Sequence, residues 1–146
     1  MENVKEIAEW FVSKAADDVN SGGEFLTKLK LQKLLYYAQG FYFAFNNKKL
    51  FRDKIIHMPY GPAVKTLLDD LKDRHNEPIK TLGVSIGNFT NDVTAILNLV
   101  YKNLGQYSAY KLVEMTHSED PWLNTEQGQE ISVAEIGDYF KKYYIK

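Results

Sequence analysis

The chain has 146 residues, of which 45% are hydrophobic and 25% charged, a composition typical of globular domains and unlike that of disordered or fibrous chains. It has no cysteine, which excludes disulfides, thiolate metal sites and a cysteine nucleophile and suits a reducing compartment, and its formal net charge of -1 argues against nucleic-acid binding. Because no stretch approaches about 20 apolar residues and the N-terminus lacks the features of a signal peptide, we expect a cytoplasmic protein without a membrane segment.

Apolar residues at helical spacing predict two helices in the first third of the chain. The first runs from Val4 to Val19 and is ended by the stretch 20–23 (Asn-Ser-Gly-Gly). The second follows Thr27, which is placed to cap it, and continues to Phe45. Its apolar face is unusually broad, so we expect a central, largely buried helix.

The middle of the chain predicts short extended pieces around a third helix. Residues 50–60 suit an extended stretch, because three apolar residues precede Pro59 there. Pro62 is predicted to open the third helix, since the first turn of a helix does not need its missing N–H. Residues 79–89 combine apolar residues with two glycines and predict a loop with a short strand.

The last third predicts three more helices. One spans residues 93–104 between a cap at Thr90 or Asn91 and a stop at Gly105, and one runs from Ser108 to His117. An irregular segment to residue 130 follows, and the final helix begins with a capping box of Ser132 and Glu135. The predicted fold class is therefore mainly α: a single domain over residues 1–146, a compact bundle of about six helices with a short strand or hairpin around residues 50–60 and 79–89.

The two signs of charge are unevenly distributed. Residues 27–54 hold seven basic side chains and one acidic one, whereas residues 112–140 hold seven acidic side chains and no Lys or Arg. One interpretation is a solvated surface whose halves attract each other weakly. The other is a polarised surface that steers a charged partner.

Three phrases of the sequence follow one another along the chain. They are Leu31-Gln32-Lys33-Leu34-Leu35-Tyr36-Tyr37-Ala38-Gln39-Gly40, then Tyr60-Gly61-Pro62, then Thr116-His117-Ser118-Glu119-Asp120-Pro121-Trp122. In this order and spacing they resemble the Panacea antitoxin domain, a family also described as SocA-like or phage-associated GepA-like. Each phrase alone is weak evidence, but the ordered trio is specific, and the resemblance extends over nearly the whole chain.

The resemblance implies a compact helical domain that neutralises small toxins by direct contact, with no catalytic residues and no cofactor. One relative is thought to present its toxin to an ATP-dependent protease, so a role as a proteolytic adaptor is an alternative. This sequence has Ile56-His57-Met58 before its Tyr-Gly-Pro, where the family more often has a small residue followed by Trp. The lining of that surface, and with it the partner, is therefore expected to differ.

The first two phrases offer candidate contacts for a partner. Around the second helix, Lys30, Lys33 and Tyr37 are predicted to face outward while the three leucines of the phrase face inward. Tyr60-Gly61-Pro62 is predicted to be a turn that leads into a helix. Free N–H groups at that helix start would accept an acidic group of a partner.

The third phrase supports two catalytic hypotheses and one structural interpretation. His117 with Glu119 and Asp120 suggests a metal site, and Ser118 with His117 suggests a nucleophilic pair. Neither has a recognised motif. The alternative is that His117 and Ser118 bond backbone groups at a helix end while Trp122 fixes the next loop to the core.

The leading hypothesis is a phage- or prophage-associated antitoxin that binds a cognate toxin protein encoded by an adjacent gene. The alternatives are the proteolytic adaptor and an uncharacterised hydrolase centred on His117 and Asp120. The predicted partner-binding residues are Lys30, Lys33, Tyr37, Tyr60, Gly61, Pro62, His117, Ser118, Glu119, Asp120 and Trp122. No catalytic residue, metal ligand or cofactor is predicted.

Overall fold

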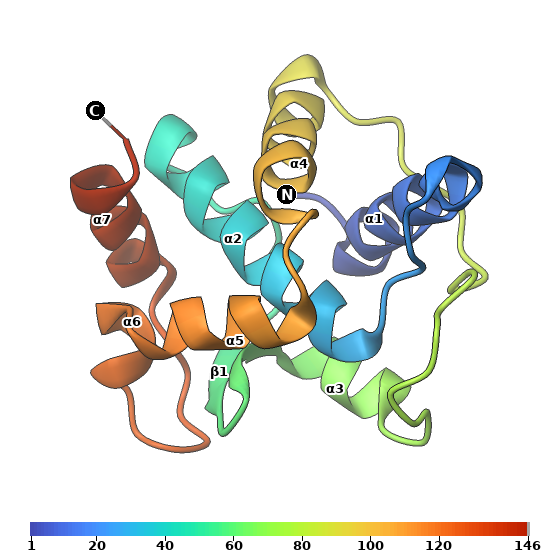
Figure 1. Cartoon of the computed structure of the whole chain (residues 1–146). Coiled ribbons are helices and arrows are strands. Elements are labelled where there is room, and N and C mark those ends of the chain that lie inside the picture. The colour runs from blue at the N-terminus through green and yellow to red at the C-terminus, as the bar shows by residue number, and fades with distance from the viewer. Residues whose placement is uncertain (146) are drawn as a thin grey trace.

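The computed structural model describes residues 1–145, and within this range the chain forms seven α-helices and one antiparallel hairpin (Figure 1). The helices are α1 (Val4–Asp18), α2 (Lys28–Asn46), α3 (Lys65–Leu71), α4 (Asn91–Leu104), α5 (Ala109–His117), α6 (Asp120–Leu123) and α7 (Val133–Tyr143). The hairpin consists of β1 (Ile55–Met58) and β2 (Gly61–Val64). The mainly helical fold class is thus confirmed, and the helix beyond the predicted six is the four-residue α6, inside the segment predicted to be irregular.

Helix α2 is the centre of the fold, as its broad apolar face predicts. It packs against α1, α4, α5, α7 and β2 (Figure 1). All ten residues from 31 to 40 are buried. Gly40 allows α7 to approach closely, because a Cβ at this position would lie 2.7 Å from Ile136 and would also clash with Phe140.

The predicted N-terminal caps are present. The side-chain oxygens of Thr27, Thr90, Ser108 and Ser132 accept bonds from the backbone N–H three residues later, at 3.4, 3.5, 3.0 and 3.4 Å. Such caps satisfy N–H groups that have no partner within the helix, and each stabilises the fold by about 1 kcal/mol. Local sequence therefore determines where these helices begin.

The prediction that Pro62 opens a helix is wrong. Residues 61–64 form β2, which pairs with β1 so that His57 lies opposite Pro62 and Met58 opposite Gly61, and the third helix begins only at Lys65. Gln32 of α2 holds the strand: its side chain accepts from the N–H of Val64 at 2.7 Å and donates to the carbonyl of Val64 at 3.2 Å. These buried bonds are made between distant segments, so local proline statistics do not anticipate them.

The strand predicted within residues 79–89 is not found there. Ile79 forms an isolated antiparallel bridge with Leu26, and the rest of the segment is irregular. The outer edge of β1 forms backbone hydrogen bonds with residues 128–131 instead. The N–H of Ile131 donates to the carbonyl of Ile55 at 2.8 Å, and the N–H of His57 donates to the carbonyl of Gln129 at 2.9 Å.

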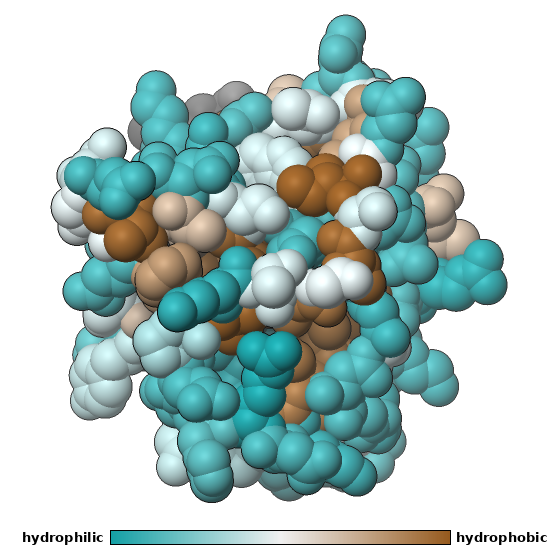
Figure 2. Space-filling model, turned by 90° about the vertical axis from the view of Figure 1, so that its right-hand side faces the viewer, coloured by the Kyte–Doolittle hydropathy of each residue, from teal (hydrophilic) through white to brown (hydrophobic). Residues whose placement is uncertain are grey.

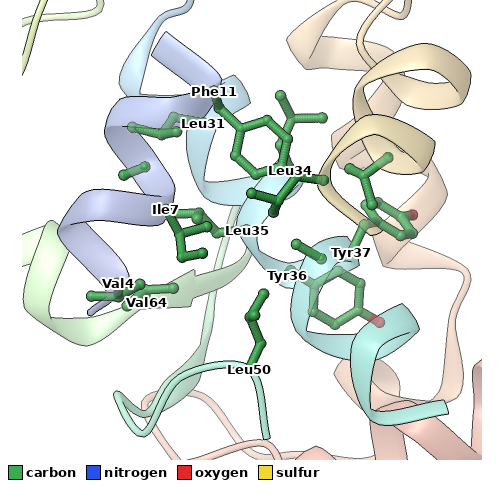
Figure 3. Close-up of a cluster of buried hydrophobic side chains, with 14 of the residues drawn as sticks. Val4, Ile7, Phe11, Leu31, Leu34, Leu35, Tyr36, Tyr37, Leu50 and Val64 are labelled. Carbon is green, nitrogen blue, oxygen red and sulfur yellow. The ribbon is translucent and has the colours of Figure 1, made fainter. Parts of the chain in front are cut away.

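The apolar core joins α1, α2, α4, α7 and the hairpin in one cluster of buried side chains. Figure 3 shows Ile7 and Phe11 of α1 beside Leu31 and Leu35 of α2, while the hydroxyl groups of Tyr36 and Tyr37 point away from α1. On the face shown in Figure 2, hydrophobic residues form separate areas between hydrophilic ones. Among residues 1–145, every helix is too short or too polar to traverse a bilayer.

Candidate functional site

The three sequence phrases meet in space beside α2. The first phrase lies on α2, the second is the turn of the hairpin, and the third runs from the end of α5 into α6. Hydrogen bonds and stacked rings connect all three. Segments separated by more than 80 residues therefore build one continuous region of the structure.

A buried carboxylate, Glu119, is the centre of this region. It is 1% exposed and accepts hydrogen bonds from the hydroxyls of Tyr36 and Tyr37, both at 2.8 Å, and from the hydroxyl of Tyr144 just after α7. A buried carboxylate requires such donors, since transferring it from water without partners is very unfavourable. Glu119 therefore ties α2, the α5–α6 corner and the end of α7 together.

Burial raises the pKa of Glu119 above its ordinary value, although its three tyrosine partners act in the opposite direction. The pKa values of Tyr36 and Tyr37 are also raised, first by burial and then by the nearby carboxylate. Each tyrosine is thus kept as a hydroxyl donor. The cluster behaves as a fixed polar contact inside the core.

A buried lysine lies under the hairpin turn. Lys33 is 1% exposed, and its ammonium group donates to the carbonyl of Pro62 at 3.2 Å. Its side chain passes directly below Gly61, where an added Cβ would lie 2.7 Å from Lys33 Cε and 2.7 Å from Thr116 Oγ1. Gly61 also has a φ of 105°, a left-handed conformation that favours glycine. Both the space and the backbone conformation therefore require glycine at this position.

Trp122 connects the third phrase to the hairpin. Its ring is stacked between the rings of His57 and His117, with centroid separations of 4.1 and 4.2 Å, and its Nε1 donates to the carbonyl of Met58 at 2.9 Å. His57 Nδ1 lies 2.8 Å from the carbonyl of Trp122, and His117 Nε2 lies 2.9 Å from that of Pro59. The structural interpretation of His117 and Trp122 is thus confirmed.

The prediction that Lys33 and Tyr37 face outward is wrong, because both are fully buried, whereas the three leucines are inside as predicted. The helix wheel fails here because α2 is surrounded on all sides. Lys30 is partly exposed and donates to the carbonyl of Gly105 at 2.5 Å. The expected anion site at a helix start is also wrong, since Gly61 and Pro62 belong to a buried strand.

The geometry does not pair the residues of the nucleophile hypothesis. Ser118 Oγ donates to the carbonyl of Met115 at 2.9 Å, while the His117 ring bonds Pro59. Each side chain thus serves a backbone carbonyl. Within residues 1–145, no three His, Asp or Glu side chains gather in a way that would hold a metal ion.

Sequence reasoning missed two members of this region. His57 forms one side of the tryptophan stack, and Tyr144 supplies the third hydroxyl on Glu119. His57 lies in the stretch before Tyr60 that we expected to differ from the family pattern, and Tyr144 lies outside the three phrases. A signal for His57 existed in the departure from the family pattern, whereas nothing in the local sequence marks Tyr144.

The fold and the cluster define a small helical domain whose most distinctive residues hold its own framework together. The family model described as Antitoxin SocA-like, Panacea domain, matches residues 31–123, which is more than half of the chain. The protein therefore belongs to the Panacea-domain family of SocA-like antitoxins. No curated protein matches the chain, and no solved structure does. The matched range contains all three phrases and ends one residue after Trp122.

Proposed function

We propose that the protein is a cytoplasmic antitoxin that neutralises a cognate toxin by direct binding, without catalysing a reaction. Membership of the family over residues 31–123 is the observation that carries this proposal. We propose further that the toxin is encoded by an adjacent gene and that the pair has a phage or prophage origin. The internal use of Ser118 and His117 on backbone carbonyls supports binding rather than hydrolysis.

The corner formed by the hairpin turn and the α5–α6 junction is the surface we assign to the toxin. Tyr60, at 69%, is one of the most exposed aromatic residues, and Ser118 and Asp120 are exposed beside the partly exposed His117 and Trp122. Hydrogen bonds and stacking hold this corner in one arrangement. A surface that is already ordered loses little entropy on binding, and an exposed tyrosine is a frequent anchor of interfaces.

Exposed acidic side chains are concentrated in the last third of the chain and support a basic partner. The exposed ones between residues 112 and 140 are Glu114, Asp120, Glu126, Glu130 and Asp138. Among the seven basic side chains of residues 27–54, by contrast, three donate hydrogen bonds to backbone carbonyls. Folding therefore leaves more of the acidic side chains of residues 112–140 exposed than of the basic side chains of residues 27–54, and such a field accelerates association with a basic toxin.

Co-expression tests the proposal. The product of the neighbouring gene should arrest growth when it is expressed alone. Cells that also express this chain should grow normally, and the two proteins should be purified as a complex. Asp120→Lys should weaken the complex at least tenfold, because it reverses a charge at the centre of the assigned corner. Glu77→Lys, the same change at an exposed site between α3 and α4, should leave it unchanged. A harmless neighbour that forms no complex would refute the proposal.

The fate of the toxin separates occlusion from delivery to a protease. Under occlusion, the half-life of the toxin in cells should be unchanged or longer when this chain is present. A markedly shorter half-life that depends on an ATP-dependent protease would identify an adaptor instead.

A further inference from the structure

A pocket of 260 Å³ lies between the first half of α2, the hairpin turn and α3. Its walls are mainly apolar, and the side chains that form them include Leu29, Met58, Ala63, Leu67, Leu68 and Leu71. Pockets for drug-sized ligands occupy about 300–1,000 Å³, so this one is of a size for a single large side chain. It adjoins the assigned corner, because Tyr60 also lines it.

Charge in this pocket has one sign. Lys28, Lys33 and Lys72 line it, and no Asp or Glu does. The nearest acidic side chains of α3 are engaged elsewhere: Asp69 pairs with Lys65 at 2.9 Å and Asp70 with Lys5 at 2.7 Å. The pocket therefore combines apolar walls with an unbalanced positive charge.

The lysines differ in how fully their N–H groups are used. Lys28 donates to the carbonyls of Leu71 and Arg74 at the end of α3, and Lys72 is exposed at the rim. Lys33 carries three N–H donors, and its ammonium bonds one acceptor, the carbonyl of Pro62. A carboxylate is the group that best complements such a set of donors.

We propose that this pocket binds a large apolar side chain of the toxin together with a carboxylate next to it. The proposal rests on the antitoxin function and specifies the partner's chemistry at the same corner. The apolar side chain lies against the leucines of α2 and α3, and the carboxylate lies near Lys72 and Lys33. Acidic surface outside the pocket and lysines inside it then give the toxin two distinct electrostatic requirements.

The protonation of Lys33 should make the affinity of the pocket for a carboxylate depend on pH. Burial lowers its pKa to about 7, so the charged form is only partly populated at neutral pH. The other titratable groups around the pocket are Lys28 on α2, Tyr60 on the hairpin and Lys72 on α3. A bound carboxylate favours charged Lys33, so binding above pH 7 takes up a proton and the affinity falls as the pH rises further.

The first experiment uses N-acetyl-phenylalanine as the probe, because it carries an aromatic ring beside a carboxylate. Titration into the full chain should shift the amide NMR signals of Gly61, Leu67 and Leu71 saturably, with a Kd of about 1 mM or tighter. The amide of the same compound, which lacks the charge, should bind at least fivefold more weakly. The absence of shifts, or equal binding of both compounds, would overturn the proposal.

The second experiment uses the toxin complex and a charge-reversed pair of variants. Lys72→Glu should weaken both the probe and the toxin at least fivefold, while Lys80→Glu, at an exposed site outside the pocket, should change neither. Unchanged toxin affinity in Lys72→Glu would overturn the pocket proposal and leave the antitoxin function standing. A neighbour without toxicity would overturn both.

Discussion

Two glycines, Gly61 and Gly128, have backbone conformations that favour glycine, but only Gly61 is also crowded by neighbouring side chains. Gly61 combines a φ of 105° with two close neighbours, so a methyl group there meets Lys33 and Thr116. Gly128 also has a positive φ, of 81°, but nothing lies within 4 Å of the place where its Cβ would be. Substitutions at these two glycines therefore distinguish the effect of backbone strain from the effect of crowding.

We expect Gly61→Ala to lower the free energy of unfolding by about 2–4 kcal/mol, because strain and overpacking add. Gly128→Ala should lower it by about 1–2 kcal/mol, the strain alone. Urea denaturation followed by circular dichroism measures both. Equal losses in the two variants would show that the close contacts with Lys33 and Thr116 contribute nothing.

The buried Lys33 should make stability depend on pH. Its pKa is about 7 in the folded protein and 10.5 as the ordinary value, so the unfolded chain binds the proton more tightly in between. The contribution of Lys33 to stability is therefore fully present above its ordinary pKa, is lost as the pH falls towards 7, and stays constant below that. Between pH 7.5 and 9.5 the free energy of unfolding should rise by about 1.4 kcal/mol per pH unit.

Lys33→Met is the control for this pH dependence of stability, since it keeps most of the aliphatic part of the side chain and removes the charge. It should abolish the rise between pH 7.5 and 9.5 and should stabilise the fold at pH 6 by about 1–3 kcal/mol. A wild-type slope that persists in the variant would place its origin in another group.

At the scale of elements, Glu119 and the tyrosines fasten α7 to α2. Tyr144 follows the end of α7, and its hydroxyl reaches the same carboxylate that accepts from Tyr36 and Tyr37 on α2. Aromatic rings pack around these hydroxyls: Phe140 of α7 lies edge-on to Tyr36 at 5.6 Å and is stacked on Tyr37 at 5.5 Å. The polar and aromatic contacts thus stabilise the same helix pair.

We expect Glu119→Gln to destabilise the fold by about 2–4 kcal/mol, because the amide NH₂ cannot accept and leaves tyrosine hydroxyls without a partner. Tyr144→Phe, which keeps the ring and removes one donor at a more exposed site, should cost about 1 kcal/mol. Hydrogen exchange in the last turn of α7 should accelerate in both. A neutral effect of Glu119→Gln on unfolding would contradict the role given to this carboxylate.

Elements were predicted well wherever local sequence determines them. The caps at Thr27, Thr90, Ser108 and Ser132 are confirmed because each bond involves residues three apart. The helix expected at Pro62 fails because Gln32, 32 residues away, holds the backbone of Val64 as a strand. Long-range hydrogen bonds of this kind have no signature in a local window.

At the scale of the whole molecule, folding changes the meaning of the charge pattern. The sequence shows a basic half and an acidic half, yet Lys28, Lys30 and Lys33 are used on backbone carbonyls, whereas of the seven acidic side chains only Glu119 is buried. The surface field is therefore less symmetric than the sequence suggests. This asymmetry supports the assignment of a basic toxin to the corner beside α5 and α6.

The sequence by itself determined the mainly helical class, the capped helix starts, the position of β1 and the family, because periodicity, caps and ordered phrases are local or nearly local properties. Tertiary structure decided which of the predicted contact residues are accessible. Lys33, Tyr37 and Glu119 are polar and lie in distinctive phrases, but α2 is enclosed by four helices and a strand, so their polar groups find partners inside the protein. Burial depends on the packing of segments far apart in the chain, and no local pattern contains that information.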